Sequence, residues 1–332
     1  MLTAWRPATS AVAERPPAVD QAIAALRAGR VDEAETVCRR LLADGGEQPG
    51  LLRLLAQVAV ARGDRAGACR ALERAVALAP ESPDPGLELA EQLAATGRAD
   101  DALQAVSRAL EHAPQAAYVH NRGGGLLARL GQPRAAAAAF RRALQLDPCL
   151  TAARYNLGLL LAMAGDHAAA AELLGRACEE EPARPAPWLQ LGGVLNALGR
   201  YDEAESALQR HLSLAPNSVH GQIWLGAAQQ FLGQFEAAEQ SYRRALALAP
   251  DAVDAHANLG RLLQAQGRPA EAEVALRAAL ERAPGHRQAR AGLAALLDQR
   301  GDYEQALALA REPDGTMPPE TAAIGARAQR HL

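Results

Sequence analysis

The sequence predicts an all-α fold in which helical hairpins stack one on the next as a solenoid. Two interlocked series of residues carry this prediction. Prolines recur every 34 residues, at Pro80, Pro114, Pro148, Pro182, Pro216, Pro250 and Pro284. Glycines recur with the same step, at Gly29, Gly63, Gly97, Gly131, Gly165, Gly199, Gly233, Gly267 and Gly301. A fixed period of this size indicates repeats that are stable only when they stack on their neighbours.

The composition favours thin layers of closely packed helices. Hydrophobic residues make up 49% of the 332 residues but aromatic residues only 3%, so few large side chains are available for one thick core. Alanine and leucine supply helix propensity and small contacts instead. The period divides the chain into nine repeats, which begin at residues 15, 49, 83, 117, 151, 185, 219, 253 and 287.

Each repeat is predicted to form two helices. In the eighth repeat, residues 253–286, the first helix gathers on one face His256, Leu259, Gly260 and Leu263. Gly267 then interrupts the helix, and the second helix has its own apolar stripe at Ala272, Leu276 and Ala279. Pro284 closes the repeat, because proline cannot continue a helix.

The pattern of these positions resembles the tetratricopeptide repeat. Residues 186–216, APWLQLGGVLNALGRYDEAESALQRHLSLAP, carry its positions at Trp188, Leu191, Gly192, Leu195, Gly199, Tyr201, Ala204, Leu208 and Pro216. The one departure is His211, where that family usually has alanine. The resemblance covers about residues 15–320 and implies a right-handed α-solenoid superhelix of helix-turn-helix repeats.

Both ends of the array depart from the pattern, as terminal repeats do. The first repeat lacks its closing proline, and Pro313 falls inside the expected second helix of the ninth repeat. We expect residues 1–14 to form a flexible leader and residues 15–320 to form the repeat array. Residues 321–332 are expected to form either a C-terminal cap helix or the start of a further repeat, in which Ala328 would hold the eighth place.

Three consecutive glycines, Gly123, Gly124 and Gly125, lie in the first helix of the fourth repeat. The eighth place of every first helix is small: Ala22, Ala56, Ala90, Gly124, Gly158, Gly192, Gly226, Gly260 and Ala294. We therefore interpret Gly124 as a packing residue and not as part of a phosphate loop, which would need a preceding strand. The two flanking glycines are extra, and each costs about 0.8–1.0 kcal/mol relative to alanine. The fourth repeat is expected to be locally soft.

Places 2, 5, 9, 12 and 13 of each first helix fall roughly opposite the stripe that packs within the hairpin. The resemblance implies that this second stripe lines a concave groove for an extended or helical peptide. Apolar anchors, amides and arginines suit that role. The predicted groove residues are Tyr118, Asn121, Arg129, Tyr155, Asn156, Leu159, Met163, Leu189, Asn196, Ile223, Gln230, Phe231 and Arg261. The alternative is that superhelical winding buries part of this stripe between adjacent first helices.

The chain contains no lysine, because all 35 basic residues are arginine. This excludes a Walker-type phosphate lysine, a Schiff-base lysine and a lysine general base. His120 and His256 hold the fourth place of their repeats, where the family has large packing residues, and the carboxylates of residues 178–182 end a second helix. With no nucleophile elbow and no metal-ligand spacing, we expect no active site, no metal and no cofactor.

The net charge of −3 without a block of like charge argues against nucleic acid as a partner. No segment approaches the roughly 18–20 apolar residues of a membrane span, so we expect no membrane insertion. The four cysteines are scattered and form no C-x-x-C pair, which is typical of a reducing cytoplasm.

These features predict a bacterial, cytoplasmic, monomeric scaffold or adaptor that binds a peptide segment of partner proteins and is not itself an enzyme. The alternative is a substrate-recruiting module of a larger or associated enzyme, since residues 22–43 resemble bacterial arrays ahead of sulfotransferase, glycosyltransferase or dioxygenase domains. The arrays that precede O-GlcNAc transferase domains carry a groove asparagine at the sixth place of successive repeats. Here only Asn156 and Asn258 hold that place, so the resemblance to this subtype is weak. Some tetratricopeptide arrays bind the terminal carboxylate of chaperones through lysine, arginine and asparagine in the groove. That mode is disfavoured here, because the chain has no lysine and its candidate groove cations, Arg129 and Arg261, lie four repeats apart.

Overall fold

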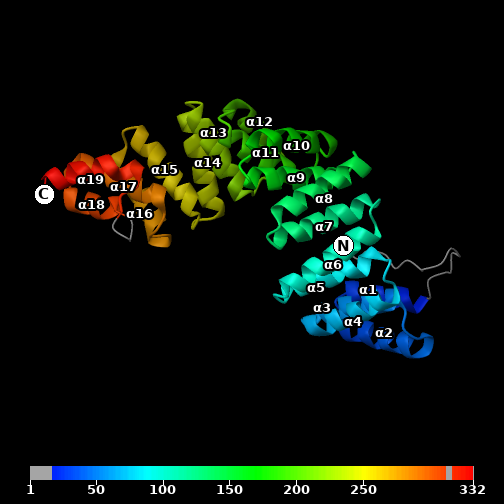
Figure 1. Cartoon of the computed structure of the whole chain (residues 1–332). Coiled ribbons are helices and arrows are strands. Elements are labelled where there is room, and N and C mark those ends of the chain that lie inside the picture. The colour runs from blue at the N-terminus through cyan, green and yellow to red at the C-terminus, as the bar shows by residue number, and fades with distance from the viewer. Residues whose placement is uncertain (1–16, 312–315, 332) are drawn as a thin grey trace. The chain divides into compact units, whose positions relative to one another are not determined.

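The computed structural model of the protein describes residues 17–311 and 316–331, which form helices and no strands (Figure 1). The predicted all-α repeat solenoid is confirmed. The leader predicted for residues 1–14 lies outside the described residues. The chain divides into two compact units, Met1–Leu160 and Leu161–Leu332, which we call the N-terminal and the C-terminal unit.

The N-terminal unit consists of four hairpins and the larger part of one further helix. Its helices are α1 (Pro17–Arg27), α2 (Val31–Gly45), α3 (Pro49–Ala61), α4 (Arg65–Leu78), α5 (Pro83–Ala95), α6 (Ala99–His112), α7 (Ala117–Arg129), α8 (Pro133–Leu146) and most of α9 (Thr151–Met163). Each first helix packs on its own second helix, and that second helix packs on the next first helix, as in α3, α4 and α5.

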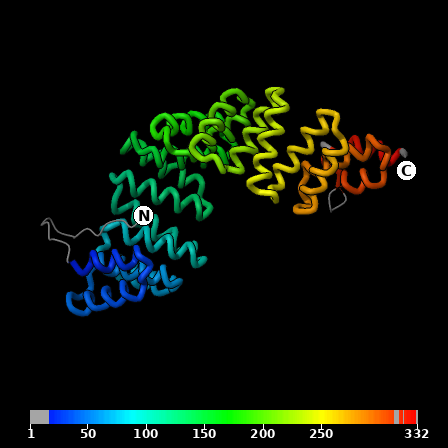
Figure 2. Tube along the Cα trace, turned by 180° about the vertical axis from the view of Figure 1, so that it is seen from behind, coloured from blue at the N-terminus to red at the C-terminus, as the bar shows by residue number. Residues whose placement is uncertain are grey.

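The C-terminal unit repeats the same arrangement, which Figure 2 follows along the chain from hairpin to hairpin. Its helices after the end of α9 are α10 (His167–Glu180), α11 (Pro185–Ala197), α12 (Tyr201–Leu214), α13 (Val219–Phe231), α14 (Phe235–Leu248), α15 (Val253–Ala265), α16 (Pro269–Arg282), α17 (Arg287–Arg300), α18 (Tyr303–Ala310) and α19 (Pro319–His331). Adjacent first helices also touch, as α11 does with α13 and α13 with α15.

The helix boundaries follow the sequence period. The first helices of the second to ninth repeats begin at the predicted residues: Pro49, Pro83, Ala117, Thr151, Pro185, Val219, Val253 and Arg287. Each periodic glycine then has a positive φ, from 72° at Gly131 to 90° at Gly301. Only glycine adopts this conformation without strain, so the glycine ends the first helix and turns the chain into the second.

The end of the array also follows its prolines. The helix α18 ends at Ala310, ahead of Pro313, and is eight residues long where the other complete repeats after the first have fourteen-residue second helices. The helix α19 begins at Pro319, two residues before the predicted boundary, and packs on α17 and α18. Its Thr321 hydroxyl donates a hydrogen bond of 2.7 Å to the carbonyl oxygen of Ala310. The position of α19 is compatible with both predicted alternatives, a C-terminal cap helix and the first helix of a further repeat.

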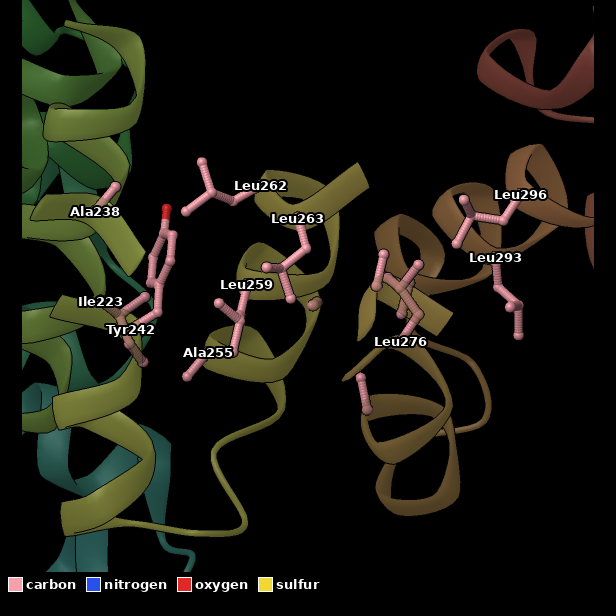
Figure 3. Packing of buried hydrophobic residues seen from close by; sticks show 14 of the residues in the cluster. Ile223, Ala238, Tyr242, Ala255, Leu259, Leu262, Leu263, Leu276, Leu293 and Leu296 are labelled. Carbon is pink, nitrogen blue, oxygen red and sulfur yellow. The ribbon is translucent and has the colours of Figure 1, made fainter. Parts of the chain in front are cut away.

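The cores are thin layers between helices, as Figure 3 shows for part of the C-terminal unit, where Tyr242 of α14 faces Leu262 of α15. The small eighth place makes room for a large side chain sixteen residues later. A Cβ atom added at Gly226 would lie 2.7 Å from the Tyr242 ring, and one at Gly124 would lie 2.7 Å from the Phe140 ring. Gly124 is therefore a packing residue, as predicted.

Candidate functional site

In the N-terminal unit, the inner stripe of the first helices is occupied by its own ion pairs. The guanidinium of Arg53 in α3 donates two hydrogen bonds to Glu88 in α5, from Nε at 3.0 Å and from Nη2 at 2.6 Å. Both side chains are largely buried. Burial alone would lower the pKa of Arg53, but the hydrogen bond and charge of Glu88, together with the charge of Asp84, raise the pKa above its usual value. The pair therefore ties one first helix to the next.

The same stripe continues with a second link. Arg122 of α7 reaches back to Glu91 of α5 at 3.0 Å and to Asp84 at 3.4 Å. The predicted groove residues Asn121 and Asn156 bond to each other, with the Asn156 Nδ2 donating to the Asn121 Oδ1 at 3.1 Å. The amides and charges of this stripe are thus largely satisfied within the unit.

Four more predicted groove residues lie in the N-terminal unit. Tyr118 is 49% exposed and Arg129 is exposed, whereas Tyr155 and Leu159 are half-buried.

The C-terminal unit does contain a recess on this stripe. It has a volume of about 370 Å³ and is formed by the end of α9, the start of α10, and α11 and α13. Its lining residues are Ala162, His167, Gln190, Gly193, Val194, Asn196, Ala197, Trp224 and Ala227. This volume falls in the range of small-ligand and side-chain pockets, roughly 300–1,000 Å³.

The wall of the recess depends on a pairing of glycine with tryptophan. A Cβ atom at Gly193 would lie 2.6 Å from the Trp224 ring, so the missing side chain lets the indole lie against α11. The predicted residue Asn196 holds α13 in place, because its Nδ2 donates to the Trp224 carbonyl oxygen at 2.9 Å. The Asn196 Oδ1 and the His167 Nδ1 are buried and have no hydrogen-bond partner among the described residues. An unpaired buried polar atom costs about 1–3 kcal/mol.

Three other predicted residues of this unit lie near the exposed ends of first helices. Phe231 is 64% exposed and stacks one face on Tyr201, with ring centroids 4.6 Å apart and an interplanar angle of 5°. Met163, at the same place of α9, is 86% exposed. Gln230 is half-buried, and its Oε1 accepts a hydrogen bond from the Tyr242 hydroxyl at 3.1 Å. Phe231 therefore offers one free aromatic face.

The prediction is wrong for Ile223. This residue is only 6% exposed and packs with Tyr242 in the core (Figure 3). Adjacent first helices α13 and α15 touch, and Ile223 lies in one core cluster with Ala255 and Leu259 of α15, so packing between first helices buries this residue. Leu189, at the fifth place of α11, is half-buried.

Arg261 lines a separate recess of about 640 Å³ between α15 and α17. Its other lining residues are Gln264, Ala265, Arg287, Gln288, Ala291, Gly292 and Gln299. Two guanidiniums and three amides line this recess and no carboxylate does, so it suits polar or anionic groups of a ligand.

Of the polar and aromatic side chains that line the Trp224 recess, sequence reasoning predicted only Asn196 and missed Trp224 itself, Gln190 and His167. Both Trp224 and Gln190 hold the sixth place of their helices, which was considered only for its asparagines. The sixth place lies about 20° from the thirteenth around a helix, so the helical period could have included it. His167 starts a second helix, and no periodic signal on the first helices could have found it.

Two further properties of the described residues concern metal ligands and membrane-spanning helices. Among them there is no group of three or more His, Cys, Asp or Glu side chains that could hold a metal ion. No helix in residues 17–311 or 316–331 is long and apolar enough to cross a membrane. His120 and His256 each bond to a proline carbonyl at the boundary of a hairpin, which is a packing role.

Family models of the tetratricopeptide repeat match most of the chain. One matches residues 59–130, 161–224 and 263–329, and a second matches residues 19–83 and 122–185. Two shorter matches cover residues 232–267 and 219–244. A search of curated proteins found no match to this chain.

Two solved structures, a chain of the Cut9–Hcn1 complex and YrrB, have a similar fold at low sequence identity. A chain of the APC/C hetero-tetramer Cut9–Hcn1 is 18% identical over 84% of this chain and 55% of its own length, with a TM-score of 0.57. YrrB, described as a TPR protein with an unusual peptide-binding site, is 22% identical over 56% of this chain and 96% of its own, with a TM-score of 0.50. MamA from Desulfovibrio magneticus RS-1 is 20% identical over 51% of this chain and 96% of its own, with a TM-score of 0.48.

The family models, the 34-residue period and the stacked hairpins agree. Tetratricopeptide repeats form scaffolds for interactions between proteins and are typically not enzymes. This chain belongs to the tetratricopeptide repeat family.

Proposed function

We propose that the protein binds an extended peptide segment of a partner protein on the first-helix stripe of the C-terminal unit. The observation that carries this proposal is the recess of about 370 Å³ beside Trp224. It combines an apolar wall with polar atoms of Gln190 and Asn196, the mixture by which grooves hold a side chain and orient its backbone. YrrB, with a similar fold, is described as having a peptide-binding site.

Two further features support this location. Phe231 presents an aromatic face that its partner Tyr201 holds in a fixed orientation, which lowers the entropy lost on binding. Arg261, in the recess of the next repeats, can donate hydrogen bonds to a carboxylate or to a backbone carbonyl oxygen. The stripe of the N-terminal unit instead bonds mostly to itself, through Arg53 and Arg122. We therefore expect the segment to anchor in the C-terminal unit.

The test is to select peptides from a random displayed library on the full chain and to measure their dissociation constants for variants. A single motif should bind at about −8 kcal/mol, in the micromolar range. Trp224→Ala and Phe231→Ala should each weaken binding about 30-fold, as loss of an anchor worth about 2 kcal/mol does. Trp188→Ala is the matched control, because that indole donates to the Pro182 carbonyl oxygen away from the recess. Unchanged binding in both variants would refute the proposal.

The alternative function differs in what the array is attached to or associated with and not in the groove that it uses. A module that recruits substrates for a transferase or dioxygenase would use the same recess, and continuation of the natural reading frame beyond Leu332 would favour it. We also propose a cytoplasmic monomer that does not bind nucleic acid. Sedimentation of the full chain with and without a DNA oligonucleotide tests both the oligomeric state and the absence of nucleic-acid binding.

A further inference from the structure

A contact recurs between first helices and the turns that precede them. In four repeats the side chain at the fourth place of the first helix bonds to the carbonyl oxygen of the proline six residues earlier. The pairs are Trp188 with Pro182 at 3.2 Å, His120 with Pro114 at 3.1 Å, His256 with Pro250 at 2.8 Å, and Arg154 with Pro148. Each of these flat side chains carries N–H groups and closes the turn between one repeat and the next.

The third repeat lacks this closing side chain. Its fourth place is Gly86, and the corresponding proline is Pro80. Within the described residues, no group donates a hydrogen bond to the Pro80 carbonyl oxygen. A Cβ atom at Gly86 would meet only ordinary contacts, at 3.6 Å from the Ala109 Cβ and 3.7 Å from the Ala105 oxygen. Space therefore remains where the fourth, fifth, sixth and eighth repeats place a ring or a guanidinium.

A recess of about 460 Å³ lies at this position in the N-terminal unit, lined by α4, α5, α6 and the turn at Pro80. Leu89, Leu93 and Ala109 line it and are buried, so its floor is apolar. Its rim carries two carboxylates and two guanidiniums, those of Glu73, Asp101, Arg98 and Arg108. Arg98 pairs with Asp101 at 2.7 Å and lies 3.9 Å from Glu73. The formal charges of the rim cancel, so the recess does not select a charged side chain.

We propose that this recess is a second binding site, which takes the indole of a tryptophan on a partner protein. The indole would supply from outside the side chain that the third repeat lacks and would donate its N–H to the Pro80 carbonyl oxygen. The apolar floor favours an indole over a guanidinium. An indole also always carries its N–H, whereas a neutral imidazole carries a proton on only one of two nitrogens. The site lies in the N-terminal unit, so it is independent of the groove beside Trp224.

The test uses N-acetyl-tryptophanamide as the probe and amide chemical shifts of the full, isotopically labelled chain as the readout. Saturable shifts are expected for amides of α5 around Gly86 and of α6 around Ala109. The analogue methylated on the indole nitrogen should bind at least tenfold more weakly, because it cannot donate to Pro80. Equal binding of the methylated probe, or no saturable shift at these amides, would overturn the proposal.

Variants at Gly86 decide whether the recess is the site. Gly86→Trp places an indole in the recess from within the chain and should abolish probe binding, while Gly86→Ala leaves the recess open and should bind within twofold of the original chain. Gly86→His, built on the example of His120 in the same chain, is a second plug should the tryptophan variant fold poorly. Undiminished binding by a folded plug variant would overturn the proposal.

Two outcomes would overturn the assigned occupant. Stronger binding of the corresponding argininamide or histidinamide probe would show that the recess does not prefer an indole. Stronger binding of the tryptophan probe by a Trp5→Ala variant would show that the chain's own Trp5 competes for the recess, which contradicts a separate partner as the source.

Discussion

The glycine triplet of α7 allows a stability prediction with opposite signs at neighbouring positions. Replacing a glycine inside a helix by alanine stabilises it by about 1 kcal/mol when the methyl group has space. A Cβ atom at Gly125 would have no heavy atom within 4 Å, so Gly125→Ala should gain that full amount. At Gly123 the nearest atom is the Leu110 Cδ2 at 3.0 Å, and the leucine must shift slightly. Gly123→Ala should therefore gain less, about 0–0.5 kcal/mol.

Gly124→Ala should be destabilising. The added methyl would lie 2.7 Å from Cε1 and 2.8 Å from Cδ1 of Phe140, a ring that is only 2% exposed. Overpacking of this kind costs about 1–3 kcal/mol, which cancels or exceeds the propensity gain. Gly124→Ala should therefore lower the free energy of unfolding by up to about 2 kcal/mol, and the Gly124→Ala and Gly125→Ala variants should differ by about 1–3 kcal/mol.

Amide hydrogen exchange measures the change in stability of α7 itself in each variant. A local measurement is needed because repeat arrays do not unfold as one unit. Gly125→Ala should raise protection of the α7 amides about fivefold, the equivalent of 1 kcal/mol. Phe140→Leu should rescue Gly124→Ala, since the second repeat pairs Ala56 with a leucine sixteen residues later. The reasoning fails if Gly124→Ala protects α7 as well as Gly125→Ala does. The predicted softness of the fourth repeat fails if residues 119–129 of the original chain are protected as strongly as the matching residues of the fifth repeat.

Three further predictions follow from single contacts. A thiol reagent should modify Cys149 first, because it is exposed while the other three cysteines are buried and burial raises their pKa; equal rates for all four thiols would contradict this. Glu88→Gln should destabilise the N-terminal unit by about 3 kcal/mol in urea unfolding, because it removes the main charge partner of buried Arg53, and a loss under 1 kcal/mol would argue against a buried pair. Gly193→Ala should displace the Trp224 indole, which lies 2.6 Å from the position of the added Cβ atom, and should therefore shift the tryptophan fluorescence. Gly175→Ala is the control and should leave the fluorescence unchanged, because a Cβ atom there has no heavy atom within 4 Å.

The helix boundaries could be predicted from the sequence because the residues that set them act locally. A glycine with positive φ ends each first helix, and a proline closes each of the second to eighth repeats, whatever the neighbours are. Burial on the inner stripe depends on how tightly adjacent first helices wind together, which the period alone does not determine. Ile223 is therefore buried while Phe231, on the same predicted stripe two turns later, is 64% exposed.

The Trp224 recess as a whole could not be predicted from the sequence, for a related reason. It requires Gly193 on one helix to face Trp224 on another, and Asn196 to bond to the backbone of that second helix. Each residue is unremarkable within its own repeat. Only the distance between α11 and α13 turns the pair into a wall, so the site is a property of two repeats together.

Departures from the repeat pattern can be sorted by whether their neighbours compensate for them. His211 is large where the family has alanine, but Gly221 faces it, and a Cβ atom there would lie 2.7 Å from the imidazole. The His211 Nδ1 bonds to the Pro185 carbonyl oxygen at 2.9 Å, so the size of this side chain is accommodated by packing, although its Nε2 is buried without a hydrogen-bond partner among the described residues. Gly86 is small where three other repeats have a ring, and no neighbouring side chain among the described residues fills the space. The missing side chain leaves a recess and a Pro80 carbonyl oxygen that accepts no hydrogen bond from the described residues. A binding partner that fills the cavity and donates to the carbonyl would restore both contacts, which is the physical reason to look for function at Gly86 and not at His211.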